Sequence, residues 1–161
     1  MTERAAEKSI VVGVDGSDAS MAALRWAAGQ ARALHAVVVA VHAWEPVAAG
    51  RAPYAPPAAR PTPAEQRVQA AQVLASALRT VFGPRIGDRV RAVVVEGQPA
   101  RVLLEQARGA LLLAIGHRGD AAHGRPVPGP IGRACLRGAT VPVVAVPAAD
   151  VQPGLRAIGA A

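Results

Sequence analysis

The sequence lacks the residues that hold together small secreted proteins and those that build membrane spans. It has a single cysteine, Cys135, in 161 residues, which excludes a disulfide framework and a cysteine-based metal site. Its longest apolar runs fall far short of the roughly 20 residues that a membrane helix needs. The segment from Met1 to Lys8 is too polar for a signal peptide. We therefore expect a cytoplasmic protein with no membrane partner.

Aromatic residues and lysine are also scarce. Aromatic residues make up 2% of the chain, and Lys8 is the only lysine, so almost all of the 18 basic residues are arginine. The formal net charge of +7 favours anionic partners, but the arginines are scattered from Arg4 to Arg156. A nucleic-acid surface needs clustered cations and aromatic rings on which bases stack. The sequence therefore predicts no nucleic-acid partner.

Signatures of catalysis are missing as well. There is no Walker-type phosphate loop, no nucleophile elbow of the form Gly-x-Ser-x-Gly, and no pair of carboxylates placed for acid–base work. His117 and His123 have no further metal ligands at a suitable spacing, which favours solvated loop histidines and predicts no metal site. His42, near the end of a predicted strand, is interpreted as structural. We expect no catalytic residues.

Apolar residues are abundant, at 52% of the chain, and they alternate between strand and helix patterns. Short β-branched runs predict strands at 10–14, 36–43, 89–95, 111–115 and 141–146. Helices are predicted between them, with apolar faces made by Leu24, Ala27, Ala28, Ala31 and Leu34 in the first and by Val68, Ala71, Ala75, Leu78 and Phe82 in the second; the third opens near Pro99 and the fourth near Pro130. This pattern predicts an α/β fold: a single doubly wound five-stranded parallel sheet with helices on both faces.

The length fits one domain with a substantial core. We expect an N-terminal tail at 1–8, the domain at 9–147 and a weakly patterned C-terminal tail at 148–161. Within the domain, residues 44–63 contain six prolines and predict an irregular loop. That loop is either a cover for a site or a tether.

Three segments are expected to converge at one edge of the sheet. In doubly wound sheets, ligands bind at the carboxyl ends of the strands, near the point where the strand order reverses. Here those ends carry Asp15-Gly-Ser, Ala43 and Gly116-His-Arg-Gly119. A glycine loop that re-enters a helix presents free backbone N–H groups, which suit phosphate. Pro130, directly after Gly129, offers neither a hydroxyl nor an N–H.

Four segments, in this order, resemble the universal stress protein family. They are Ile10-Val-Val-Gly-Val-Asp-Gly-Ser, Val41-His-Ala-Trp-Glu-Pro, Glu96-Gly-Gln-Pro-Ala-Arg-Val-Leu, and Gly116-x-x-Gly119 followed after nine residues by Gly129 and later by a Val-Pro-Val-Val strand. The resemblance covers roughly Ser9 to Pro147. It implies a doubly wound α/β domain that acts in stress tolerance and is often a homodimer through its last strand, here Val141 to Val146.

The resemblance also implies a ligand, because some members of the family bind ATP. In those members, the aspartate that matches Asp15 lies near the adenine and ribose, and the backbone that matches Ala43 meets the base. The matching glycines line the ribose and phosphates. With Arg118 and two helix N–H groups added as phosphate contacts, the predicted site consists of Asp15, Ala43, Gly116, Arg118, Gly119, Gly129, Ile131 and Gly132. The cofactor implied is ATP, with or without Mg²⁺.

The phosphate loop departs from the family pattern. Pro130 replaces the Ser or Thr that follows the last glycine, and Asp120 brings a carboxylate near the phosphate path. The loss of one hydroxyl and one amide costs on the order of 1–3 kcal/mol if both would bond a charged phosphate. Arg118 and Arg125 offset part of that cost.

Two functions stay open. The first is a stress-response module that binds ATP or another adenine nucleotide and acts through its dimer or a partner. The second is a family member without nucleotide binding that serves as an interaction protein. A dedicated enzyme is not expected, and slow ATP hydrolysis is at most a side activity.

Overall fold

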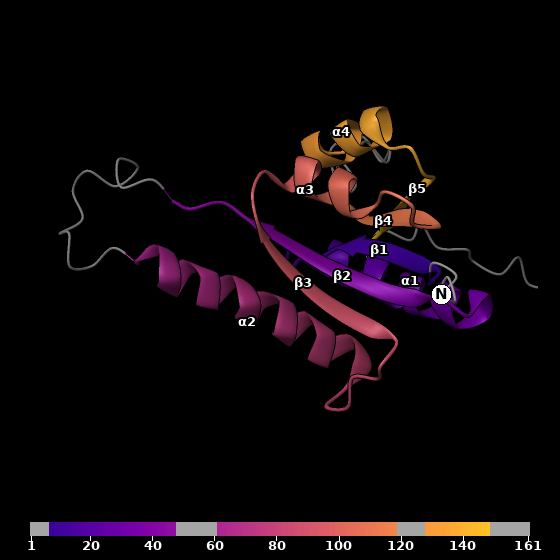
Figure 1. The fold of residues 1–161 in the computed structure, drawn as a ribbon, viewed down its shortest axis with the longest axis horizontal. Coiled ribbons are helices and arrows are strands. Elements are labelled where there is room, and N and C mark those ends of the chain that lie inside the picture. Colours follow the sequence, from indigo (N-terminus) through magenta and orange to yellow (C-terminus); the bar gives the residue numbers. More distant parts are fainter. Residues whose placement is uncertain (1–6, 48–60, 119–127, 149–161) are drawn as a thin grey trace, which may run out of the picture.

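The computed structural model describes residues 7–47, 61–118 and 128–148. Strands and helices alternate along them (Figure 1), in the order β1 Ser9–Gly13, α1 Asp18–Leu34, β2 Val37–Trp44, α2 Pro63–Phe82, β3 Val90–Glu96, α3 Pro99–Gln106, β4 Leu112–His117, α4 Pro130–Gly138 and β5 Val143–Pro147. Most of both expected tails (1–6 and 149–161), the central part of the proline-rich loop (48–60) and the glycine-loop segment 119–127 lie outside the described residues.

All five strands are parallel, and their order in the sheet is β3-β2-β1-β4-β5. This confirms the predicted doubly wound five-stranded sheet. The order reverses at β1, which pairs with β2 on one side and with β4 on the other. The chain therefore leaves the carboxyl ends of β1 and β4 in opposite directions, and this arrangement opens a crevice between them.

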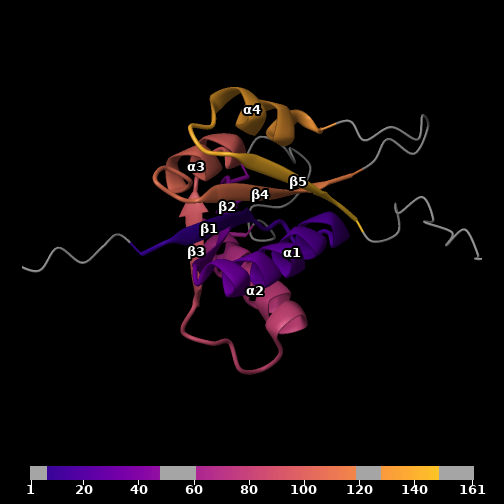
Figure 2. The ribbon, with the colours of Figure 1, turned by 90° about the vertical axis from the view of Figure 1, so that its right-hand side faces the viewer.

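Helices cover both faces of the sheet, as predicted (Figures 1 and 2). α1 and α2 lie on one face, and α3 and α4 lie on the other. Alternate residues of β1 enter different cores: Ile10 packs with Leu24 and Leu74 on the first face, while Val11 packs with Leu103 on the second. Because β1 is buried on both sides, its apolar run is continuous rather than alternating.

The helix starts follow from local chemistry. Ser17 caps α1, because its side-chain oxygen accepts a hydrogen bond from the Ser20 N–H. Thr62 and Glu65 form a reciprocal capping box at the start of α2. α3 and α4 begin at Pro99 and Pro130, the position where a missing N–H costs least.

The predicted apolar face of α2 is confirmed at Leu78, which is buried, and at Phe82, which packs against the core, but it is wrong toward the start of the helix. The buried residues are Ala70, Leu74, Ala77 and Leu78, whereas Val68 is 56% exposed. Alanine and valine occur all around this helix, so two neighbouring stripes have similar apolarity. Leu74, which is 1% exposed, selects the stripe that faces the sheet. The end of the predicted α1 face is also wrong, since Leu34 in the last turn is exposed.

Two details near the carboxyl-terminal end of the domain also differ from the predictions. β5 begins at Val143 rather than at Val141, after Pro142, which has no N–H to donate. His117 is the last residue of β4 rather than a solvated loop residue. It is 6% exposed, and its two ring nitrogens lack a hydrogen-bond partner among the described residues.

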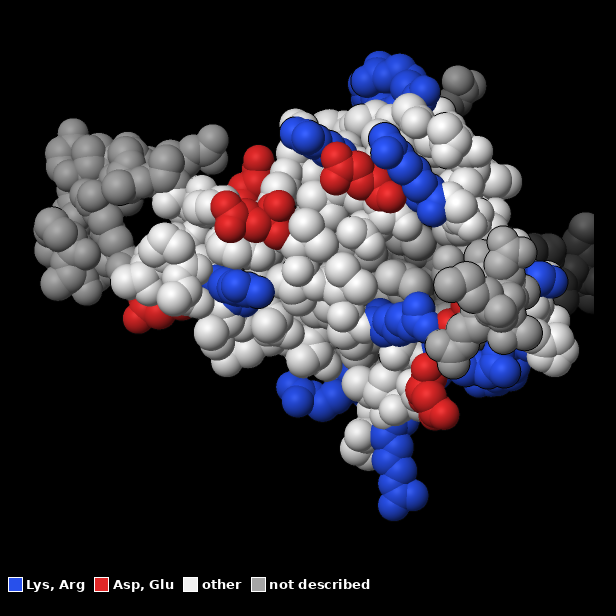
Figure 3. All heavy atoms as spheres, in the orientation of Figure 1, with Lys and Arg blue, Asp and Glu red and all other residues white. Residues whose placement is uncertain are grey.

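On the face shown in Figure 3, basic side chains lie in separate groups with acidic and uncharged residues between them. One of the ion pairs joins Arg91 of β3 to Glu7. Across the described ranges, no helix combines the length and the apolarity needed to cross a membrane.

Candidate functional site

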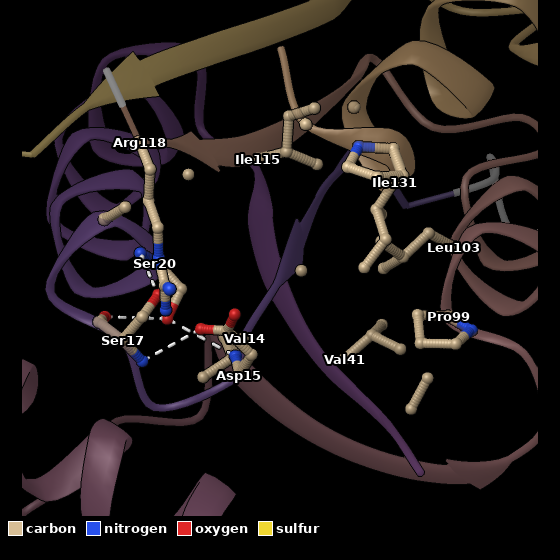
Figure 4. A pocket seen from close by; sticks show the side chains of 17 residues that line it. Val14, Asp15, Ser17, Ser20, Val41, Pro99, Leu103, Ile115, Arg118 and Ile131 are labelled. Carbon is tan, nitrogen blue, oxygen red and sulfur yellow. Dashed lines mark hydrogen bonds between the residues drawn. The ribbon is translucent and has the colours of Figure 1, made fainter. Parts of the chain in front are cut away.

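A cavity of about 360 Å³ lies in the crevice at the carboxyl ends of β1 and β4. Its wall is built from several elements: the end of β1 and the start of α1, the end of β2, the start of α3, the end of β4, and the start of α4. The cavity has two unlike sides (Figure 4). Polar groups gather near α1, and apolar side chains face them from β2, α3 and α4.

Asp15 is the acidic centre of the polar side. One of its carboxylate oxygens accepts a hydrogen bond from the Ser17 N–H at 2.8 Å, and the Asp15 N–H donates to the Ser20 hydroxyl at 3.3 Å. The Ser20 hydroxyl in turn donates to the Ser17 carbonyl at 2.9 Å. This small network holds the carboxylate at the mouth of the crevice, so Asp15 presents an acceptor to a bound molecule.

Opposing effects act on the ionisation of Asp15. Burial alone raises the pKa of the carboxyl group, but hydrogen bonds from Ser17 and Ser20 and the positive charge of Arg118 outweigh burial, so the pKa is lowered. Arg118 extends from the end of β4 toward Ser17 and Ser20 (Figure 4). Asp15 is therefore ionised at neutral pH and faces a cation across the polar side.

The carboxyl end of β1 is further fixed by His42. Its Nδ1 lies 2.7 Å from the carbonyl oxygen of Val14. Because a carbonyl only accepts, Nδ1 carries the hydrogen in this contact. The bond ties β2 to the residue directly before Asp15, which agrees with the structural role expected for His42.

The apolar side is formed by aliphatic side chains. Val41 of β2, Pro99 and Leu103 of α3, and Ile115 of β4 line it. Leu103 and Val41 are buried in the core of the second face. Rigid aliphatic surface opposite hydrogen-bonding groups suits a planar ring that carries a polar substituent.

Gly116 sets the closeness of β4 and α1. A Cβ atom at this position would lie 2.5 Å from the Ser20 nitrogen and 2.6 Å from the Ala19 carbonyl oxygen. These are backbone atoms of the first turn of α1, so no side-chain rotation could relieve the overlap. Only glycine permits this approach, which brings the polar network of α1 against the end of β4.

The start of α4 supplies backbone donors. Gly129 is the N-cap, and the Arg133 N–H already bonds to the Gly129 carbonyl at 2.9 Å. Helix geometry leaves the N–H groups of Ile131 and Gly132 without acceptors inside the helix. Pro130 lines the cavity beside them and contributes no N–H.

The structure brings most of the predicted site residues together. Those that line the cavity are Asp15, Ala43, Gly116, Arg118, Gly129, Ile131 and Gly132, while Gly119 lies outside the described residues. The predicted site residues did not include Ser17, Ser20 or the side chains of the apolar wall, although the segment Asp15-Gly-Ser was expected at the site. An apolar residue in a strand gives no sign of whether it faces a core or a cavity.

Comparisons with known proteins agree with this arrangement. The family model described as the Universal stress protein family matches residues 7–147. The chain belongs to the universal stress protein family. A universal stress protein of Mycolicibacterium smegmatis is 32% identical over 151 residues, which are 91% of this chain and 50% of that protein. The chain thus spans about half the length of this curated relative.

Solved universal stress proteins share the fold. One, in complex with cAMP, superposes with a TM-score of 0.63 at 23% identity, covering 89% of this chain and 99% of that one. Another, from Archaeoglobus fulgidus in complex with dAMP, has a TM-score of 0.59 at 22% identity, covering 86% and 97%. At these identities the likeness supports the fold, and the ligands belong to those proteins.

Proposed function

We propose that this universal stress protein binds an adenine nucleotide in the cavity between β1 and β4 and acts as a ligand-responsive module. One observation carries the proposal: residues from distant parts of the chain, singled out by sequence, line a single cavity at the switch point of the sheet. The complexes of related proteins with cAMP and dAMP support the ligand class.

The two sides of the cavity suggest how the nucleotide lies. The base packs on Val41, Pro99 and Leu103, next to the Ala43 backbone, where aliphatic surface replaces water. The ionised Asp15 has one oxygen bonded to Ser17, and the other accepts from a ribose hydroxyl. Phosphate then faces the free N–H groups at the start of α4, and Arg118 supplies a positive charge on the polar side of the cavity.

Calorimetric titration with adenosine, AMP and ATP tests the proposal, after any nucleotide that co-purifies has been identified. Micromolar or tighter affinity for at least one ligand is expected. Asp15→Asn weakens it, because the variant loses the charged acceptor, whereas Asp18→Asn, an equal charge change in the first turn of α1, leaves it unchanged. If no ligand gives heat at millimolar concentration and the melting temperature does not move, the proposal fails.

The position of Pro130 favours a second candidate function. This is a universal stress protein that does not bind nucleotides and serves as an interaction protein. Pro130 lies in the cavity wall at the first position of α4 and removes one N–H donor from it. Pro130→Ser separates the two functions. A weakened nucleotide site tightens when the donor and a hydroxyl are added, whereas a site closed by other residues gives no response.

The proposal includes a homodimer through β5. Among the described residues, β5 pairs with β4 alone, so its outer edge has unpaired N–H and carbonyl groups. Leu136 of α4, the helix directly before β5 in the chain, is 50% exposed. A second copy that covers the outer edge of β5 and the Leu136 side chain would protect a strand edge that otherwise favours aggregation.

Sedimentation velocity with matched edge variants tests the dimer. Ala145 of β5 and Ala92 of β3 are both exposed, on opposite edges of the sheet. We expect Ala145→Lys to give a monomer and Ala92→Lys to leave the dimer intact. A wild-type protein that stays monomeric at high micromolar concentration, or a dimer broken only by the β3 variant, refutes this interface.

A further inference from the structure

The backbone hydrogen bonds between β1 and β2 stop one step before the cavity. On the side of β1, the Val41 carbonyl accepts a hydrogen bond from the Val14 N–H at 2.8 Å. On the side of β3, the Trp44 carbonyl accepts one from the Gly97 N–H at 2.8 Å. Because successive residues of β2 alternate between its two neighbours, the backbone groups of Ala43 point toward β1. The next bond of the parallel ladder would join the Ala43 N–H to the Val14 carbonyl.

The side chain of His42 takes the place of that bond. Its Nδ1–H donates to the Val14 carbonyl at 2.7 Å, and no backbone hydrogen bond joins the described residues Ala43 and Val14. Val41 and Ala43 pack on the second face of the sheet, so the half-buried His42 side chain leaves β2 on the first face. His42 is not among the described residues that line the cavity, so it acts on a ligand there only through the backbone.

The substitution leaves the Ala43 N–H available at the cavity wall. Beyond Val14 the chain turns away from β2, because Gly16 has φ 83° and α1 begins at Asp18. Ala43 lines the cavity at this opening. An N–H that leaves the ladder next to a cavity is a donor for a bound molecule. N1 of adenine is a bare acceptor, whereas N1 of hypoxanthine carries a hydrogen, so such a donor distinguishes the two bases.

We propose that His42 is a positioning residue for the base: it occupies the Val14 carbonyl and so keeps the Ala43 N–H open toward the cavity. The ligand step rests on the proposed nucleotide function, but the backbone step can be measured without a ligand. The role needs a donor at the place of Nδ1, one atom beyond Cγ. The amide nitrogen of asparagine lies there, that of glutamine lies one atom further out, and leucine has no donor.

Hydrogen exchange of the full chain, followed by NMR without ligand, tests the backbone step. We expect the Ala43 amide to exchange at least tenfold faster than the Val14 amide, which bonds to Val41. His42→Leu and His42→Gln release the Val14 carbonyl to the Ala43 N–H, so exchange at Ala43 slows, whereas His42→Asn keeps it fast. In wild type, ¹⁵N spectra of the neutral His42 ring show the hydrogen on Nδ1. A neutral ring with its hydrogen on Nε2, or exchange at Ala43 that is the same in all folded variants, overturns the proposal.

Calorimetric titration with adenosine and inosine tests the ligand step. His42→Leu lowers the affinity for adenosine by roughly threefold to tenfold, which corresponds to one hydrogen bond, and brings it closer to that for inosine. His42→Asn restores both the affinity and the preference. The control is His35→Asn, an exposed position with a left-handed backbone that asparagine tolerates, and it leaves both unchanged.

The outcomes distinguish this inference from the proposed function. If wild type binds adenosine and the folded leucine variant keeps its affinity and its preference over inosine, the role of His42 is overturned while nucleotide binding stands. If no adenine ligand binds to wild type, the proposed function falls. Exchange at the Ala43 amide then still decides whether His42 keeps this N–H open.

Discussion

Gly116→Ala is the sharpest test of how the site is held together. The added methyl group would overlap the backbone of Ala19 and Ser20 in the first turn of α1, at 2.5 Å from the Ser20 nitrogen. Because both partners are main chain, β4 and α1 must move apart. Overpacking of this kind costs typically 1–3 kcal/mol, and a backbone clash lies at the upper end, at about 3 kcal/mol.

Urea and thermal denaturation, followed by circular dichroism, measure the effect. A loss of about 3 kcal/mol lowers the melting temperature of a domain of this size by roughly 6–12 °C. The matched control is Gly29→Ala in the middle of α1, where an added Cβ meets nothing within 4 Å. That change should stabilise the protein by about 0.5–1 kcal/mol, because alanine favours the helix.

Gly129→Ala tests whether a glycine at the site without a close backbone neighbour tolerates a side chain, in contrast to Gly116. Gly129 has φ −65° and ψ 179°, which any residue adopts, and among the described residues beyond its chain neighbours no atom lies within 4 Å of its Cβ position. The loss of stability should therefore stay below about 1 kcal/mol, as expected for a substitution at a helix N-cap. A Gly116→Ala protein within about 1 kcal/mol of wild type would refute the argument, since it would show that the contact relaxes freely.

Three further predictions follow from the site and the core. The pKa of Asp15 in the folded protein is lowered from its usual value of 3.8, so the ionised carboxylate stabilises the fold above pH 3.8, and this stabilisation is lost as the pH falls through the folded pKa. The free energies of unfolding of wild type and Asp15→Asn should therefore differ at neutral pH and converge in acid. Burial raises the pKa of the Cys135 thiol, so a thiol reagent should modify it only at the rate of unfolding, and fast modification of the native protein would contradict its burial. Leu74→Ala should cost about 2–5 kcal/mol in urea denaturation, whereas Val68→Ala, on the exposed side of α2, should change stability by less than about 0.5 kcal/mol.

Much of the fold could be predicted because the signals are local. A β-branched run bounded by Asp15 and Gly16 identifies β1, and proline at the first helical position identifies the starts of α3 and α4. The continuous apolar run of β1 indicates burial on both faces, which only a sheet between two helical layers provides. The resemblance to the universal stress protein family then supplied most of the predicted site residues.

The parts that could not be predicted depend on tertiary packing. His117 follows Gly116 in a motif typical of a loop, yet β4 continues through it and pairs it with Pro147. Leu74 is buried and so marks the stripe of α2 that faces the sheet. Helical spacing alone does not show which of the two apolar stripes this is. The apolar wall of the cavity is likewise invisible in sequence, because Val41 and Leu103 look like any other core residues.

The place of β1 in the sheet has a consequence for the order of folding. β1 pairs with β2, which follows soon along the chain, and with β4, which follows only after α2, β3 and α3. Pairings between distant segments form slowly, because a long loop must close first. During synthesis, Asp15 and its network appear early, but the cavity is not complete until β4 and α4 emerge. A ligand of this cavity therefore stabilises only chains whose folding is essentially complete.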